Sequence, residues 1–176
     1  MYGEKPKLII FTGVDATGKS TIVEYISNKL NIPTKHMDKV KNEEEGKKLN
    51  YAILNNTNDD LIMDRYYMEE CVYAIVYRNY EAKYIQELEN LLLTKFNVVI
   101  VYTFAETEVI EERFDSRGES FTKKENISEL KKLYDDFLQN SLIKKKILIN
   151  TTNNLIEKDY NDIIRLLENI LSKEIN

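Results

Sequence analysis

Near its N-terminus the chain reads Gly13-Val14-Asp15-Ala16-Thr17-Gly18-Lys19-Ser20-Thr21, which matches the pattern G-x-x-x-x-G-K-[ST]. The apolar run Leu8-Ile9-Ile10-Phe11 precedes it, and a helical stripe of apolar residues follows it. In this strand, loop and helix arrangement the glycines let the backbone wrap closely, so that its N–H groups and the helix N-terminus can hold phosphate groups. The sequence therefore predicts a phosphate-binding loop that holds ATP. Its predicted contacts are Gly13, Ala16, Thr17, Gly18, Lys19, Ser20 and Thr21.

The rest of the chain alternates between two patterns. Short β-branched runs at 7–12, 61–64, 97–104 and 147–152, and a shorter one at 34–37, predict strands, and the segments between them have helical periodicity. Helices are expected over 43–54 and 107–116 and in three apolar stripes within 22–30, 127–138 and 155–170. Alternation of this kind indicates parallel strands joined by helices. We expect a three-layer α/β fold, a five-stranded parallel sheet flanked by helices, as a single domain over 1–176.

Composition narrows the function classes. The chain has 176 residues, 43% of them hydrophobic, with 5 Gly and 2 Pro, which is typical of a globular domain rather than a disordered segment. Its net charge of -5 argues against broad neutralisation of nucleic-acid phosphates. The single Cys71 fits a reducing, cytoplasmic setting, and no apolar run approaches the length of a membrane span. A small anionic ligand is consistent with this composition, and a nucleic acid or a membrane is not expected as a partner.

Asp64 follows the apolar residues Leu61-Ile62-Met63, which are predicted to form a strand. A fold with a phosphate-binding loop requires an acidic residue at the end of a neighbouring strand, and Asp64 has that position. We expect Asp64 and the Ser20 hydroxyl to hold Mg²⁺, while Lys19 neutralises the phosphate oxygens. A guanine-reading Asn-Lys-x-Asp motif is absent from the expected position, because Asn28-Lys29-Leu30-Asn31 lies on the first helix and lacks the Asp. A switch GTPase is therefore disfavoured.

Three arginines indicate a kinase. Arg65 directly follows Asp64, where its guanidinium is suited to bind an acceptor phosphate with two parallel hydrogen bonds. Arg113 and Arg117 are four residues apart on a predicted helix and precede Gly118, which predicts a closing lid over about 113–125. The alternative is that the two lid arginines pair with neighbouring glutamates on a solvated helix face.

Together these residues resemble the thymidylate kinase family. The phosphate loop with its internal Asp15, the segment Asp64-Arg65-Tyr66 and the arginines before Gly118 carry this resemblance. It implies that Asp15 lies near the sugar of the acceptor, that Arg65 holds the acceptor phosphate, and that Tyr73 lies by the base or sugar. Because some members have a basic residue where this chain has Ala16, the lid is expected to supply the catalytic arginine here.

Two departures concern the base. Glu69-Glu70 replaces a stretch in which the family usually has Ser, and Tyr51 is the only nearby aromatic residue before Asp64 that is available to stack on a base. We expect Glu69 and Glu70 to lie beside the acceptor and to set its base preference, or else to be exposed helix residues. With Tyr51, Tyr66 and Tyr73 they complete the expected substrate contacts.

The leading hypothesis is an ATP- and Mg²⁺-dependent kinase that phosphorylates a deoxynucleoside monophosphate such as dTMP or dUMP. The runner-up is a deoxynucleoside kinase, which needs a carboxylate such as Asp38 to take the proton of a 5'-hydroxyl. A nonenzymatic nucleotide-binding protein is the third hypothesis. A homodimer is a further expectation, with Tyr80, Tyr84 and the Leu88-Leu91-Leu92 stripe as a candidate face and the hydrophobic core as the alternative place for that stripe.

Overall fold

The computed structural model describes residues 4–117 and 122–172 and is built on one parallel sheet. Its strands are β1 (Lys7–Thr12), β2 (Thr34–His36), β3 (Leu61–Asp64), β4 (Asn97–Phe104) and β5 (Lys146–Asn150), in the order β2-β3-β1-β4-β5. The five predicted strands are confirmed, with β2 one residue shorter than expected. β5 ends at Asn150, two residues before the expected position. The next residue, Thr151, still donates its backbone N–H to the Phe104 carbonyl of β4 (2.8 Å), and its hydroxyl donates to the Thr17 carbonyl (3.0 Å).

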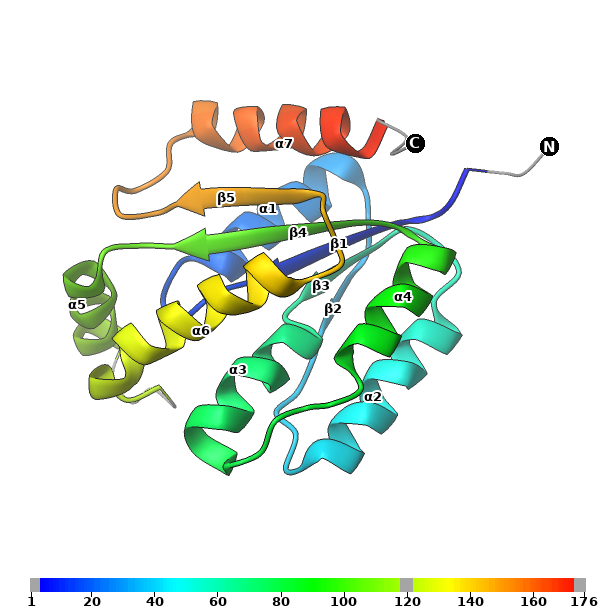
Figure 1. The fold of residues 1–176 in the computed structure, drawn as a ribbon. Helices are drawn as coiled ribbons and strands as arrows, with labels where there is room; N and C mark the ends of the chain where they lie inside the picture. The colour runs from blue at the N-terminus through cyan, green and yellow to red at the C-terminus, as the bar shows by residue number, and fades with distance from the viewer. Residues whose placement is uncertain (1–3, 118–121, 173–176) are drawn as a thin grey trace.

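Two helices cover one face of the sheet (Figure 1). These are α1 (Lys19–Leu30) and α7 (Glu157–Ser172). Alternate strand residues such as Ile9, Phe11 and Val99 point to this face and pack with Ile26 of α1 and Leu167 of α7. The expected apolar stripes of the first and last helices are therefore core stripes.

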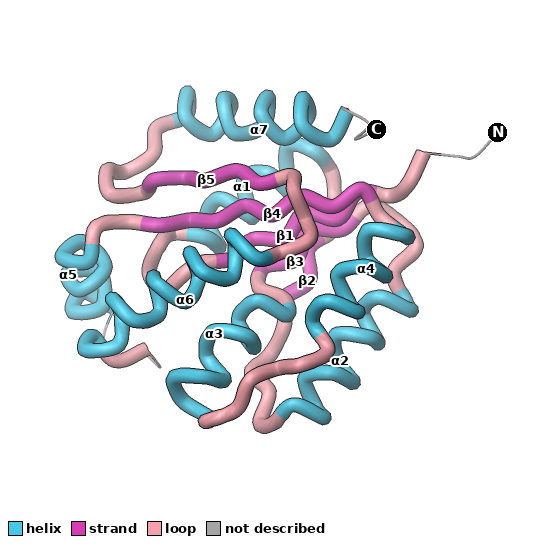
Figure 2. Tube along the Cα trace, in the orientation of Figure 1, coloured by secondary structure: helices cyan, strands magenta, loops and turns pink. Residues whose placement is uncertain are grey.

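Four helices cover the other face (Figures 1 and 2). They are α2 (Glu43–Asn56), α3 (Tyr67–Arg78), α4 (Ile85–Lys95) and α6 (Ile127–Asn140), the last preceded by the 3-10 turn Lys124–Asn126. The inner strands β1 and β4 are buried on both faces, as the near-continuous apolar runs predict. In the proposed dimer stripe Leu88 and Leu92 are fully buried, and Leu91 is 40% exposed, so most of that stripe belongs to the core.

The remaining helix, α5 (Thr107–Arg117), lies beyond the carboxyl ends of β4 and β5 (Figure 1). The segment predicted as a lid thus begins on α5 and ends in the turn before α6, and its residues 118–121, including Gly118, lie outside the described residues. No helix in the described ranges is long and apolar enough to cross a bilayer. The sheet is consequently the middle layer of a three-layer fold, and the phosphate loop, Asp64 and Arg65 follow the carboxyl ends of its strands.

Candidate active site

The phosphate loop joins β1 to α1 and has an unusual backbone. Gly13 has φ +137°, and a Cβ atom there would lie 2.2 Å from the Thr103 carbonyl oxygen of β4. Gly18 has φ +78°, while Ala16 has φ 65° and is one of the non-glycine residues in the left-handed region. Glycine is required at Gly13 on both steric and conformational grounds. The loop therefore wraps tightly against β4.

Hydroxyl groups fasten this loop to the sheet. The Thr17 and Thr103 hydroxyl oxygens are 2.7 Å apart, and Thr17 also donates to the Val14 carbonyl at 2.8 Å. Thr103 in turn contacts the Thr12 carbonyl at 3.3 Å. Because all these groups are buried and paired, the loop is held in one conformation.

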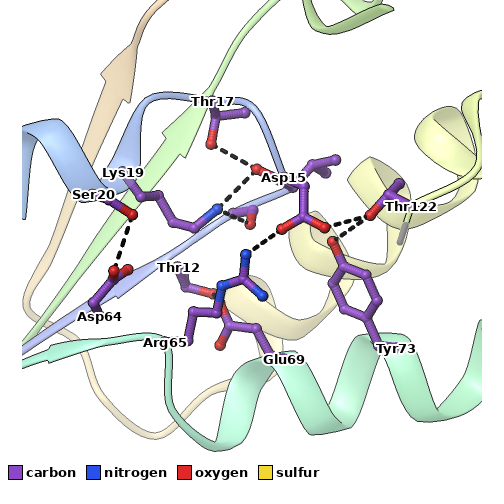
Figure 3. Close-up of polar contacts among 12 residues, drawn as sticks. Thr12, Asp15, Thr17, Lys19, Ser20, Asp64, Arg65, Glu69, Tyr73 and Thr122 are labelled. Atoms are coloured by element: carbon purple, nitrogen blue, oxygen red, sulfur yellow. Dashed lines mark hydrogen bonds and ion pairs between the residues drawn. The ribbon is translucent and has the colours of Figure 1, made fainter. Parts of the chain in front are cut away.

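Lys19 lies inside the loop (Figure 3). Its ammonium donates hydrogen bonds to the carbonyls of Gly13 (2.6 Å) and Val14 (2.9 Å), and the residue is only 5% exposed. Burial lowers the pKa of Lys19 to about 8, against the opposing attraction of Asp15 and Glu69. The phosphate loop thus positions Lys19, whose ammonium group is expected to neutralise the phosphates that this loop binds.

Ser20 and Asp64 meet at the ends of α1 and β3. The Ser20 hydroxyl donates to Asp64 Oδ2 at 3.0 Å, and His36 Nδ1 lies 3.4 Å from the same oxygen. The other carboxylate oxygen, Oδ1, is buried and has no hydrogen-bond partner among the described residues. A carboxylate and a hydroxyl are hard oxygen donors of the kind Mg²⁺ prefers, and an unpaired buried carboxylate oxygen is a ready ligand. These two residues therefore fit the predicted Mg²⁺ site.

Asp15 and Arg65 link the phosphate loop to the end of β3. Arg65 donates to Asp15 Oδ1 at 2.5 Å, and Thr122 donates to Asp15 Oδ2 at 2.7 Å. The Tyr73 hydroxyl lies 3.1 Å from the Thr122 hydroxyl, so the carboxylate has cationic and hydroxyl partners on its two sides (Figure 3). Burial alone would raise the pKa of Asp15, but Arg65 and Lys19 outweigh it and lower that pKa. Asp15 is consequently an ionised carboxylate that orients Arg65.

Arg65 itself has φ 72°, a left-handed conformation that non-glycine residues rarely adopt. Its backbone N–H donates to the Phe11 carbonyl at 3.1 Å, which ties this turn to β1. Strain of this kind persists only where the surroundings enforce it, and it gathers at functional sites. The turn directs the Arg65 side chain toward the phosphate loop.

Glu69 lies in the first turn of α3, next to these groups. Its carboxylate accepts hydrogen bonds from the Thr12 hydroxyl (3.2 Å) and from the Tyr66 N–H (3.1 Å). Burial raises the pKa of Glu69 to about 7, although Lys19 and Arg65 act in the opposite direction. The expected alternative of an exposed helix residue is therefore wrong for Glu69.

Glu70 has a different environment. It is 2% exposed, and its carboxylate accepts hydrogen bonds from Tyr84 (2.5 Å), Asn50 (3.1 Å) and Tyr80 (3.2 Å). The alternative expectation, that Glu70 is an exposed helix residue, is therefore also wrong. Because three protein donors already hold this carboxylate, Glu70 connects α3 to α2 and to the residues before α4.

One pocket brings several of these residues together. Its internal cavity has a volume of about 40 Å³, and its lining residues are Met37, Asp38, Lys39, Val40, Arg65, Tyr66, Glu69, Glu70, Tyr73 and Arg78. Sequence reasoning missed Lys39 and Arg78 as members of this group. Tyr66, Glu70 and Tyr73 follow one another at spacings of four and three residues, but Arg78 is five residues after Tyr73, so helical spacing gave no signal for it.

Of the expected substrate contacts, Tyr51 is not brought to the pocket, and Tyr66 lines it only as a core side chain. Tyr66 lines the pocket but is fully buried, and its hydroxyl donates to the Asn50 carbonyl at 2.8 Å, so its ring is a core side chain. Tyr51 is not among the lining residues and lies instead beside Tyr84, with ring centroids 6.1 Å apart. Tyr66 therefore packs against α2, and Tyr51, which belongs to α2, packs against Tyr84 before α4.

Arg113 contacts the protein rather than open solvent. Its guanidinium donates to the carbonyls of Thr151 (2.6 Å) and Ala16 (3.3 Å), so it joins α5 to the phosphate loop and to the segment after β5. The alternative pairing with neighbouring glutamates is not seen for Arg113 among the described residues. Arg117 is the last residue of α5, and its side chain lies outside what the structure describes.

A strand, a wrapped glycine loop and a helix that opens with Lys-Ser, with an acidic residue on the adjacent strand β3, form a phosphate-binding loop in a three-layer α/β fold. No protein-family model matches the chain. The SPbeta prophage-derived uncharacterized protein YorR of Bacillus subtilis (strain 168) is 28% identical over 142 residues, which cover 76% of this chain and 83% of YorR.

Solved structures of low identity share the fold. The YorR protein from Bacillus subtilis, in complex with phosphorylated GDP, aligns with a TM-score of 0.77 at 23% identity over 96% of this chain and 99% of its own. Polyphosphate Kinase 2 from Arthrobacter aurescens TC1 has a TM-score of 0.73 at 16% identity (97% and 69% covered). Deoxyadenosine kinase from M. mycoides, with the products dCMP and dCDP bound, has a TM-score of 0.58 at 19% identity (93% and 97% covered). The three-layer α/β fold is thereby that of P-loop kinases.

Proposed function

We propose that this chain is an ATP- and Mg²⁺-dependent kinase that transfers the γ-phosphoryl group of ATP to a deoxynucleoside monophosphate. The observation that carries the proposal is the position of Arg65. It lies on the wall of the acceptor pocket and is bonded to Asp15 of the phosphate loop, so its guanidinium lies between the acceptor pocket and the loop. A monophosphate brings a charge of about -2, which suits a guanidinium with five N–H donors, of which the Asp15 bond takes one.

In this proposal the loop over 13–21 holds the triphosphate, and Lys19 lies at its β- and γ-phosphates. Ser20 and Asp64 hold Mg²⁺, which when bound neutralises charge on the phosphate oxygens. The acceptor oxygen is already ionised, so the chain has to position and neutralise rather than remove a proton. Arg113 holds the loop in shape through Ala16, and Arg117 remains the candidate for an arginine that closes over the phosphates.

The relatives support the nucleotide class of the acceptor. YorR was crystallised with phosphorylated GDP, and the deoxyadenosine kinase with dCMP and dCDP. The resemblance to thymidylate kinases favours dTMP or dUMP, but the position of Tyr51 removes one support for a stacked thymine. The proposal therefore commits to the monophosphate group. A homodimer in a cytoplasmic setting remains a prediction.

A deoxynucleoside kinase is the second candidate, and Asp38 favours it because this exposed carboxylate lines the same pocket. Asp15 suits the role of general base less well, since its lowered pKa and its bond to Arg65 keep it ionised and occupied.

The experiment supplies ATP and MgCl₂ with each of the four deoxynucleosides and each of their monophosphates, and separates the products by ion-exchange chromatography. We expect ADP together with deoxynucleoside diphosphate, and no product when EDTA is added or when Lys19→Met replaces the wild type. Deoxynucleoside monophosphate as the product would support the second candidate. ATP binding without any product would support a nonenzymatic nucleotide-binding protein.

A further inference from the structure

The acceptor pocket has two cationic ends along α3. Arg65 precedes the helix, next to the phosphate loop, and Arg78 is its last residue. Glu69, which contacts Thr12 beside the loop, is nine residues before Arg78, or about 13 Å along a helix. Arg65 and Arg78 thus lie toward opposite ends of one pocket.

The Arg78 guanidinium has an unused donor. Its Nε atom is shielded from solvent and has no hydrogen-bond partner among the described residues. A buried donor without a partner destabilises the folded state, and such groups are rare in proteins. An acceptor atom supplied by a bound ligand would satisfy it.

The surroundings of Arg78 fix its orientation. The guanidinium carbon lies 5.8 Å from the centre of the Tyr80 ring, and the Tyr80 hydroxyl donates to Glu70 at 3.2 Å. Glu70 is held in turn by Asn50 and Tyr84, and the charge of Arg78 acts on its carboxylate. Arg78 thus packs against hydrogen-bonded side chains at the wall of the pocket, and its Nε has no partner among the described residues.

We propose that Arg78 recognises the base of the acceptor and selects a base with two adjacent acceptor atoms on one edge. This inference rests on the proposed function. The Nε–H and a neighbouring guanidinium N–H point in parallel and match two acceptors side by side. Guanine offers O6 and N7, and cytosine offers O2 and N3, whereas thymine and adenine place a donor beside each acceptor or offer one acceptor alone. The proposed class is therefore guanine or cytosine deoxynucleotides.

The test measures dGMP, dCMP, dAMP and dTMP in two ways: binding by calorimetry without ATP, and kcat/KM with ATP and MgCl₂. It compares the wild type with Arg78→Lys, which keeps the charge but loses the parallel donors, and with Arg78→Ala. Arg165→Ala is the matched control, because Arg165 is exposed on α7 and pairs with Asp162. Thermal melting identifies any variant that fails to fold. If Arg78→Ala fails to fold, the comparison of the wild type with Arg78→Lys is the test.

We expect dGMP or dCMP to be preferred by about tenfold or more, and Arg78→Lys to remove most of that preference while Arg165→Ala keeps it. A wild-type preference for dTMP or dAMP, unchanged ratios in the Arg78 variants, equal weakening of all four nucleotides, or no binding of any monophosphate would overturn the inference. Equal weakening would mean that Arg78 contacts the phosphate. Base-selective binding that depends on Arg78, without any product, would support the role of Arg78 and refute the kinase proposal. Phosphoryl transfer with the same base preference in the wild type and the Arg78 variants would support the kinase proposal and refute the role of Arg78.

Discussion

Glu69 shows how one side chain reports on the charge balance of the site. It lies near both Lys19 and Arg65, yet its pKa is raised to about 7 because burial outweighs their attraction. Its hydrogen bonds from Thr12 and the Tyr66 N–H fix it at the start of α3. A carboxyl group in this state links the stability of the fold to pH.

The sign of that link follows from the two pKa values. The usual pKa of the Glu69 carboxyl is 4.5, and in the folded chain it is about 7, so between these values the folded state binds more protons than the unfolded state. The free energy of unfolding should therefore fall as pH rises from 4.5 to 7. Glu69→Gln should remove this part of the slope, as measured by urea unfolding at several pH values. The exposed Glu24→Gln on α1 is the control, and a Glu69→Gln slope equal to that of the wild type would contradict the assignment.

At the scale of elements, the phosphate loop depends on its contact with β4. Gly13→Ala should strongly destabilise the fold, by about 3 kcal/mol or more, because the new Cβ would meet the Thr103 carbonyl at 2.2 Å in addition to the strain of its positive φ. Gly18→Ala is the matched variant: its φ is also positive, but no atom lies within 4 Å of the added Cβ, so a cost of about 1 kcal/mol is expected. Equal losses in thermal or urea unfolding would show that the close approach to β4 is relieved by movement of the loop.

Arg113 is the corresponding contact of α5. Since it donates to Ala16 and Thr151, Arg113→Ala should loosen the phosphate loop and raise the ATP dissociation constant by about tenfold. Calorimetric titration with ATP measures this, with Arg165→Ala as the control. A loss of turnover at unchanged ATP affinity would contradict this expectation. It would indicate instead that Arg113 acts on the reacting phosphates, as expected for a lid arginine.

Local patterns predicted the elements well and the distant contacts poorly. The phosphate loop, Asp64 and Arg65 are adjacent in sequence to the strands that position them, so their locations followed from the motif. Arg78 and Thr122 reach the site from the end of α3 and from the segment before α6, and no local pattern joins them to Asp15 or Arg65. The partners of Arg113 were missed for the same reason.

For the molecule as a whole, the phosphate loop and the acceptor pocket are built from different parts of the fold. The carboxyl ends of β1 and β4 support the phosphate loop, while α3 and the segment between β2 and α2 form the acceptor pocket. The net charge of -5 does not prevent binding of anions, because Lys39, Arg65 and Arg78 line the pocket and Lys19 lies in the phosphate loop. The bond between Asp15 and Arg65 joins the two parts.

The central claim is that the acceptor carries a phosphate that Arg65 binds, and the steady-state KM of the acceptor in Arg65→Lys tests it most directly. We predict that the monophosphates are phosphorylated faster than their nucleosides, that Arg65→Lys raises the acceptor KM by about tenfold or more because Lys lacks the parallel donors, and that inorganic phosphate competes with the acceptor. Faster phosphorylation of a deoxynucleoside than of its monophosphate, together with an unchanged acceptor KM in Arg65→Lys, would contradict the account.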